Sequence, residues 1–310
     1  MLANKLKIGD TIGVIAPDKA LKSKDIKPLE NATKYFESLG LNVKYGKYLF
    51  SEDNYCAGTP EERAKDLNDM FSDKKIKAIF TVKGGDMVNG ILPYIDFKNI
   101  KNNPKIFLGM SDITVLLCAI NKMTGLITFH CQDYVWFGKD EVTDYDKNEI
   151  IDKLFNGNKT ILPYEGRQFI DFKNEEIKGK IYGTNVRCLL KLLGTPYMPN
   201  LENAVLFLEG FHSDIIQWNS MLEQYNQMNA FNKAIVFGYI YQLQNIEKNK
   251  YSIVDELRKI NSNVPVVKTD DFGHMHGNSI IPIGAEVKIN ANDKSIIVSN
   301  YLKWKGEKVC

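Results

Sequence analysis

The sequence has 310 residues, 44% hydrophobic and 25% charged, and its 40 basic and 38 acidic side chains give a net charge of +2. This composition is typical of a globular protein with a large core, and the lack of a basic arm argues against nucleic acid as a partner. Apolar runs are too short to span a bilayer and the first residues lack the apolar stretch of a signal peptide, so we expect a cytoplasmic protein without membrane contacts.

Short apolar runs alternate with amphipathic stretches in the first part of the chain. The runs predict buried strands and the stretches predict helices, one of which opens with Thr59 and Glu62 at capping-box spacing. This alternation predicts an α/β fold with a mostly parallel sheet covered by helices. The expected strands are 11–17, 41–46, 76–85, 105–109 and 126–130, and the expected helices are 26–40, 59–73 and 112–123.

The pattern weakens between residues 138 and 178, where the composition becomes polar, and we expect a linker with one short helix near 149–155. We therefore predict an N-terminal domain over 1–137 and a C-terminal domain over 179–310. In the second domain strands and helices alternate again, and 285–299 reads as a hairpin around an Asn-Asp turn.

The five cysteines are scattered without CxxC spacing, and the four histidines form no HExxH pattern. Reduced thiols fit this distribution better than a disulfide framework or a zinc site. We therefore expect neither a metal nor a cofactor.

Ser111 lies in the stretch KIFLGMSDIT, at the corner between a predicted strand and a predicted helix. A serine at such a corner can simply cap the helix. It can also be the nucleophile of a tight strand-to-helix turn, for which Gly109 gives the backbone room. The G-x-S-x-G pattern of α/β-hydrolases is not met, because Ile113 occupies its last position.

Three other places could supply the groups that a nucleophilic serine needs. Gly84 and Gly85 end a predicted strand and expose backbone N–H groups that can bind an oxyanion, although neither a Walker A loop nor a G-x-G-x-x-G motif is present. His274 follows a predicted strand and is a candidate base, while Glu209 ends a buried strand and could orient a histidine. Taken singly, each residue also fits an ordinary structural role.

The order of these motifs resembles the serine LD-carboxypeptidases (peptidase family S66), which include muropeptide LD-carboxypeptidases and microcin C immunity hydrolases. The resemblance covers nearly the whole chain, through LKIGDTIGVIAP, the segment ending in TVKGG, PKIFLGMSDITVLLCAI, LLGTPYMP, VLFLEG and FGHMHGNSIIPIGAEVKI. It implies a Rossmann-like N-terminal half, a smaller β-rich C-terminal half and a cytoplasmic homodimer.

The resemblance also implies the roles of individual residues. The family's nucleophile maps onto Ser111, its triad glutamate onto Glu209 and its histidine onto His274, with His276 as a competing base. The family's oxyanion hole maps onto backbone N–H groups. The corresponding residues are Gly85 and Asp112, or Asp86 if the turn is shifted by one.

Several positions that border the expected cleft depart from the family pattern. Asp86, Asn185, Arg187 and His130 are therefore candidates for substrate recognition, and Trp136 could stack on a nucleotide or serve packing. The resemblance favours a carboxypeptidase that releases terminal D-Ala from muropeptides. The alternatives are a hydrolase of peptidyl or aminoacyl nucleotides, a non-catalytic binding protein on the same scaffold, and a nucleotide-binding Rossmann protein, which lacks its fingerprint. Apart from a small peptide or peptide-nucleotide substrate, no partner other than a second copy is expected.

Overall fold

The structure is a computed structural model, and it describes residues 1–173, 176–243, 252–261, 263–274 and 277–303. His276, the competing base candidate, lies outside the described residues. Within these ranges, no helix combines the length and the apolar character needed to cross a membrane.

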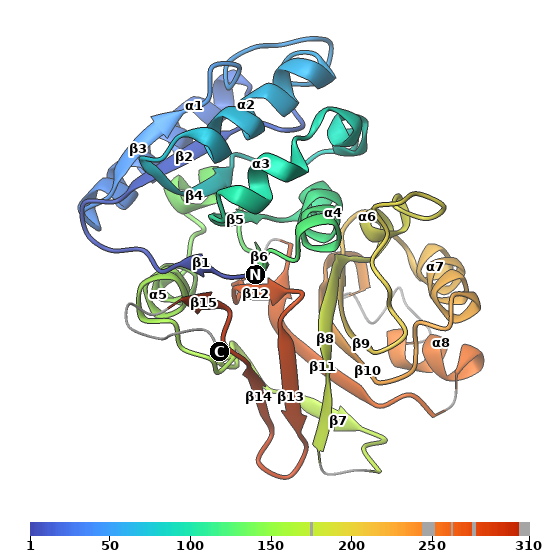
Figure 1. The fold of residues 1–310 in the computed structure, drawn as a ribbon. Helices are drawn as coiled ribbons and strands as arrows, with labels where there is room; N and C mark the ends of the chain where they lie inside the picture. Colours follow the sequence, from blue (N-terminus) through green and yellow to red (C-terminus); the bar gives the residue numbers. More distant parts are fainter. Residues whose placement is uncertain (174–175, 244–251, 262, 275–276, 304–310) are drawn as a thin grey trace.

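The first half of the chain builds an open sheet with helices packed on it (Figure 1). The strand order is β12-β6-β5-β4-β2-β3, and every pair is parallel except β12 with β6. The parallel α/β prediction for this half is confirmed. The strands are β2 (Thr11–Ile15), β3 (Asn42–Tyr45), β4 (Ile76–Thr81), β5 (Ile106–Gly109), β6 (Thr128–His130) and β12 (Ile281–Ile283), and the helices are α1 (Ser23–Ser38), α2 (Pro60–Ser72), α3 (Phe97–Asn102) and α4 (Thr114–Thr124).

The start of α2 shows how local sequence fixes an element. The Thr59 hydroxyl accepts from the Glu62 backbone N–H at 3.3 Å, and the Glu62 carboxylate accepts from the Thr59 N–H at 2.9 Å. Pro60 follows at the first helical position, where its missing N–H costs nothing. The capping box expected from the sequence is therefore formed.

The second half builds a larger mixed sheet in the order β14-β13-β8-β9-β10-β11-β7. Its centre is parallel and both edges are antiparallel, and β13 with β14 forms the expected terminal hairpin. The elements are β7 (Gln168–Ile170), β8 (Glu176–Asn185), β9 (Ala204–Gly210), β10 (Ala234–Ile240), β11 (Val266–Gly273), β13 (Glu286–Asn290), β14 (Ser295–Val298), α6 (Val186–Leu190), α7 (Ile215–Gln227) and α8 (Ile253–Ile260).

Two strands pair with a sheet from a different segment than the one in which the sequence places them. β12 belongs to the second half of the sequence but pairs with β6 of the first sheet, and β7 lies in the expected linker but pairs with β11. The linker also holds the helix α5 (Asp144–Glu149), which continues as a wider π-helical turn over Ile150–Asn156. A further strand pair, β1 (Ala3–Asn4) with β15 (Leu302–Lys303), joins two segments at opposite ends of the described chain.

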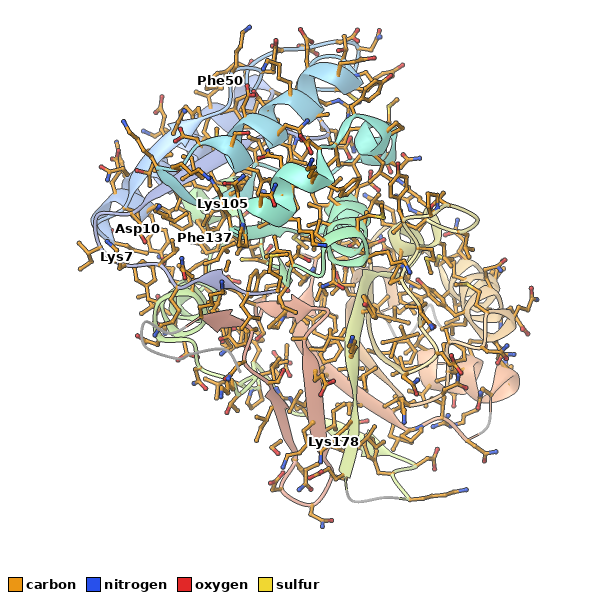
Figure 2. All side chains as sticks on the ribbon, in the orientation of Figure 1. Lys7, Asp10, Phe50, Lys105, Phe137 and Lys178 are labelled. Carbon is orange, nitrogen blue, oxygen red and sulfur yellow. The ribbon has the colours of Figure 1, made fainter. Side chains whose placement is uncertain are left out.

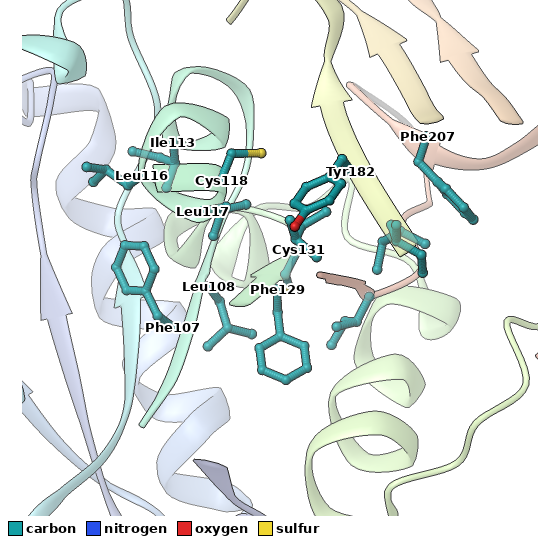
Figure 3. Packing of buried hydrophobic residues seen from close by; sticks show 14 of the residues in the cluster. Phe107, Leu108, Ile113, Leu116, Leu117, Cys118, Phe129, Cys131, Tyr182 and Phe207 are labelled. Carbon is teal, nitrogen blue, oxygen red and sulfur yellow. The ribbon is translucent and has the colours of Figure 1, made fainter. Parts of the chain in front are cut away.

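The two sheets share one continuous core, with α4 at their junction (Figure 3). The Tyr182 hydroxyl of β8 donates to Asn121 Oδ1 of α4 at 3.0 Å, and the Cys118 thiol of α4 donates to the Gly183 carbonyl at 3.1 Å. Figure 2 shows the two halves stacked lengthwise, with Phe50 near one end of the molecule and Lys178 near the other. The junction brings the end of β5 close to the ends of β8 and β9, where the candidate residues lie.

Candidate active site

Ser111 lies at the sharp turn between β5 and α4, and it opens a short 3-10 turn over Ser111–Ile113. Its φ of +59° is in the left-handed region, which costs a non-glycine residue about 1–2 kcal/mol. Such strain persists only where the surroundings enforce it, and it is a feature of nucleophile turns. The turn depends on Gly109, because a Cβ there would lie 2.4 Å from Thr81 Oγ1.

His274 and Glu209 meet at the ends of two strands of the second sheet. His274 directly follows β11, and its Nδ1 lies 2.6 Å from Oε2 of Glu209, which is fully buried near the end of β9. Burial alone would raise the pKa of Glu209, but the histidine holds it below its usual value. Burial alone would lower the pKa of His274, but the carboxylate of Glu209 raises it above its usual value. The pair is therefore strongly coupled, with Nδ1 engaged by the carboxylate.

The pair is held in place by neighbours on both sides. Asn185 Nδ2 donates to Glu209 Oε1 at 3.1 Å, and its Oδ1 accepts from the Cys188 N–H as the N-cap of α6. The Phe211 ring stacks on the His274 ring, with the centroids 4.8 Å apart and the planes 4° from parallel. Packing and hydrogen bonding together restrict the imidazole to one orientation.

Ser111 and His274 line the same cleft, which has a volume of about 210 Å³. Glu209 lies behind the histidine, away from solvent. No hydrogen bond joins the Ser111 hydroxyl to the His274 ring among the described residues, and such contacts often tighten only when substrate binds. The structure thus brings the predicted serine to the same cleft as the histidine and its carboxylate.

The glycine pair forms the wall beside Ser111. A Cβ on Gly84 would lie 2.7 Å from the Ser111 Cβ, and one on Gly85 would lie 2.4 Å from the carboxyl group of Asp18. Only glycine allows this approach. The Gly84 N–H points to Asp133 Oδ2 at 3.4 Å, whereas the Gly85 N–H forms no backbone or side-chain hydrogen bond within the described ranges. Asp112 is the second residue of the 3-10 turn, where backbone N–H groups lack partners within the helix.

The expected substrate-contact residues fall into two groups. Arg187 and Asp86 line the cleft and pair with each other at 2.8 Å, and Lys19 pairs with the same carboxylate at 3.2 Å. Asn185 also lines the cleft, but both ends of its amide are engaged by protein groups. It therefore orients Glu209 in this structure, while its role as a substrate contact stays a prediction.

His130 does not border the cleft, contrary to the expectation from its neighbours in the sequence. It is fully buried, with Nδ1 2.6 Å from Thr184 Oγ1 and Nε2 3.2 Å from Asn278 Oδ1, and burial lowers its pKa to about 4. The His130 side chain, on the last residue of β6, points into the core and not toward the cleft. Trp136 is 6% exposed and its indole N–H donates to Asp146 Oδ2 at 3.3 Å, so it serves packing.

Sequence patterns missed several polar groups at the cleft, above all Asp133 and Asp18. Asp133 lines the cleft, burial raises its pKa to about 7, and its Oδ1 has no hydrogen-bond partner within the described ranges. Asp18 lies behind Gly85, 1% exposed. Asp18 follows a predicted strand by one residue, and Asp133 follows another by three. Their position at the carboxyl edge of a predicted parallel sheet could have marked them as site candidates.

Comparison with known proteins identifies the family of the chain. The pattern of the LD-carboxypeptidase N-terminal domain matches residues 12–131, and that of the LD-carboxypeptidase C-terminal domain matches residues 178–289. The chain belongs to the LD-carboxypeptidase family. The resemblance to this family is thereby confirmed, and the α/β fold class is confirmed by the solved structures described below.

Relatives of two kinds are found in this family. A probable murein peptide carboxypeptidase of Bacillus subtilis is 31% identical, with 94% of this chain and 92% of the relative covered. The microcin C7 self-immunity protein MccF of Escherichia coli is 25% identical, with 97% of each chain covered. Full-length similarity to both kinds places the chain among the peptidase-type hydrolases of the family.

Solved structures show the same fold. The microcin C7 self-immunity protein MccF in complex with aspartyl sulfamoyl adenosine superimposes with a TM-score of 0.90 at 26% identity, covering 98% of this chain and 100% of that one. The muramoyltetrapeptide carboxypeptidase of Oxalobacter formigenes superimposes with a TM-score of 0.79 at 22% identity, covering 94% and 100%. The second likeness bears on the fold alone.

Proposed function

We propose that this protein is a serine-type LD-carboxypeptidase that hydrolyses the L,D-peptide bond to a terminal D-Ala in cytoplasmic muropeptides. The observation that carries the proposal is the 2.6 Å contact between Glu209 and His274, in a cleft shared with the strained Ser111 turn. A buried carboxylate, an oriented imidazole and a serine on a forced turn are the parts of an acyl-transfer site.

In this mechanism His274 removes the hydroxyl proton of Ser111, and Oγ attacks the scissile carbonyl carbon. Glu209 keeps the proton of Nδ1 directed at itself and stabilises the imidazolium that forms. The N–H groups of Gly85 and Asp112 hold the developing oxyanion. His274 then protonates the departing amine of D-Ala, and water activated by the same ring clears the acyl-enzyme.

The alternative within the family is hydrolysis of peptidyl or aminoacyl nucleotides, as in microcin immunity. The TM-score of 0.90 to MccF bound to aspartyl sulfamoyl adenosine favours it. However, Trp136, the aromatic residue that the sequence offered either for stacking on a nucleotide or for packing, is 6% exposed and engaged with Asp146. The muropeptide therefore remains the preferred substrate class.

A mass-spectrometric digest of two substrate pools tests the choice. One pool contains tetrapeptides ending in an L,D-bonded D-Ala, and the other contains aminoacyl sulfamoyl nucleosides of the microcin type. Loss of D-Ala only from the first pool supports the proposal, and cleavage only in the second supports the alternative. Binding without cleavage in both pools, with no difference between the wild type and Ser111→Ala, would indicate the non-catalytic protein on the same scaffold.

The proposed assembly is a homodimer, as the family resemblance implies. Light scattering across a range of protein concentrations measures the mass directly. A mass of one chain throughout the range would remove the homodimer from the proposal without affecting the chemistry of the cleft.

A further inference from the structure

Two buried carboxyl groups meet directly behind the glycine pair. Asp18 follows β2 by three residues and Asp112 follows Ser111, and their exposed fractions are 1% and 0%. They accept from the consecutive backbone N–H groups of Met87 and Val88, so the two carboxyl groups lie side by side. Two buried carboxylates side by side would repel each other, which favours a proton shared between them.

Both carboxyl groups also hold the backbone of the turn that the glycines begin. Asp18 accepts from the Met87 N–H at 3.2 and 3.3 Å, and Asp112 Oδ2 accepts from the Val88 N–H at 3.0 Å. Gly85 itself packs on the Asp18 carboxyl group. The carboxyl pair therefore connects the glycine turn with the Ser111 turn. These two turns are 27 residues apart in the sequence, and together they supply the two proposed oxyanion donors.

The surrounding charges determine where the proton resides. Lys191 Nζ lies 2.5 Å from Asp112 Oδ1 and donates to the Asp86 carbonyl at 2.7 Å, so Asp112 is the partner stabilised as an anion. Burial and then Asp112 raise the pKa of Asp18 to about 7. Burial alone would raise the pKa of Asp112, but its hydrogen bonds with Asp18 and Lys191 lower it.

Five further titratable groups lie around Asp18. The Arg63 guanidinium of α2 donates to the Pro17 carbonyl at 2.8 Å and adds positive charge, while Lys19, Tyr55, Cys56 and Asp86 line the small cavity beside the carboxyl group. Burial raises the pKa of the Cys56 thiol.

We propose that Asp18 is a positioning residue of the reaction: its carboxylic acid donates a hydrogen bond to the Asp112 carboxylate and so holds the Gly85 and Asp112 backbone N–H groups in register as one oxyanion hole. The inference rests on the proposed serine mechanism. Loss of the proton leaves two carboxylates facing each other, which pushes the two turns apart. Because the oxyanion exists only in the transition state, kcat should fall while KM changes little.

The test compares kcat of the wild type, Asp18→Asn and Asp18→Ala on the D-Ala-terminated tetrapeptide between about pH 6 and pH 9. The asparagine amide can still donate to Asp112 and accept from Met87, but it does not titrate. We expect the wild type to lose about tenfold in kcat per pH unit on its alkaline limb, and Asp18→Asn to lack this limb. Asp18→Ala should lose about 10- to 100-fold at every pH, with KM within about threefold.

Asp66→Asn is the matched control. Asp66 is also a buried aspartate whose pKa is raised by burial, and it also holds two backbone N–H groups, those of Lys47 and Tyr48, each at 2.9 Å. It does not line the cleft. A purely structural role of buried aspartates predicts the same kinetic behaviour for both asparagine variants, whereas our proposal predicts a changed pH profile only for Asp18→Asn.

Infrared difference spectroscopy gives a readout that needs no substrate. Titration of the wild type through about pH 7 should remove a carboxylic-acid carbonyl band that Asp18→Asn lacks from the start. An alkaline limb that persists in Asp18→Asn, or an Asp18→Ala protein with wild-type kcat, overturns the inference even if the enzyme is active. A wild type that cleaves no tetrapeptide overturns the proposed function instead, and the infrared titration still reports whether the pair shares a proton.

Discussion

Two hollows open at opposite ends of α4, and the larger one lacks the arrangement needed for chemistry. The cleft at the N-terminal end has a volume of about 210 Å³ and contains Ser111 and His274. The groove at the C-terminal end has a volume of about 820 Å³, and its cationic groups include Lys122, Lys180 and the N-terminal amino group of Met1. Burial, then Lys303 and Lys180, lowers the pKa of that amino group, so positive charge gathers there.

The comparison shows that positioned groups mark a site better than volume does. Lys122 and Lys180 are exposed to solvent. In the cleft, by contrast, Ser111 is held at a φ of +59° and His274 is fixed between Glu209 and Phe211. Strain and restricted side-chain orientation have to be compensated by the rest of the fold, and they are the features that catalysis requires.

Among the variants that test this comparison between the cleft and the groove, Ser111→Ala should have the largest effect. Removal of the nucleophile should lower kcat by about 10³- to 10⁶-fold, since the residual rate would come from binding and the oxyanion donors alone. Release of D-Ala followed by mass spectrometry measures the rate, and circular dichroism checks the fold. A folded variant with near wild-type turnover would exclude the serine mechanism.

Glu209→Gln should have the next largest effect. The amide can still contact His274 but cannot stabilise an imidazolium, so we expect kcat to fall by about 10³- to 10⁴-fold. Asn185→Ala leaves the Glu209 carboxylate in place and removes its 3.1 Å bond from Asn185 together with the N-cap of α6, so it should cost about tenfold. Equal losses in the two variants would show that Asn185 acts on the substrate rather than through Glu209.

The acidic limb of the pH profile tests the electrostatic side of the same pair. His274 acts as a base only when neutral, and Glu209 raises its pKa above 6.5, so kcat/KM should rise with pH and have its midpoint above 6.5. In Glu209→Gln the raising charge is gone while burial remains, so the midpoint should move down. Asp18→Asn is the cleaner background, because it lacks the alkaline limb. An unchanged midpoint in Glu209→Gln would contradict the assignment of His274 as the base.

Much of the site was predictable because its residues are tied to strand ends. Ser111 and His274 follow β5 and β11, and Glu209 lies near the end of β9, and parallel strands bring such positions to the carboxyl edges of their two sheets. The parallel rhythm of the first half was equally clear. The family resemblance then supplied the pairing of residues that lie 65 and 98 positions apart, which periodicity alone cannot give.

The parts that escaped prediction depend on long-range packing. His130 also ends a strand, yet β6 turns its ring into the core against Thr184 and Asn278. The contact between Asp18 and Asp112 joins segments 94 residues apart and has no local pattern. Likewise, nothing in the weakly patterned 138–178 stretch shows that Gln168–Ile170 pairs with β11. Each of these contacts depends on a residue that is distant in the sequence and becomes a neighbour only in the folded chain.

The smallest effect is expected from the groove. The double variant Lys122→Ala/Lys180→Ala removes two exposed charges, and kcat/KM for the tetrapeptide should stay within about twofold of the wild type at physiological ionic strength. The 11 residues of α4 separate the two hollows by about 16 Å. This is about twice the screening length of roughly 8 Å at that ionic strength, so the lysines should hardly alter the potential at Ser111. The kinetics are measured at low and physiological salt. A loss above tenfold that persists at physiological salt would mean that the groove takes part in substrate binding, and the division between a chemical cleft and a solvated groove would be wrong.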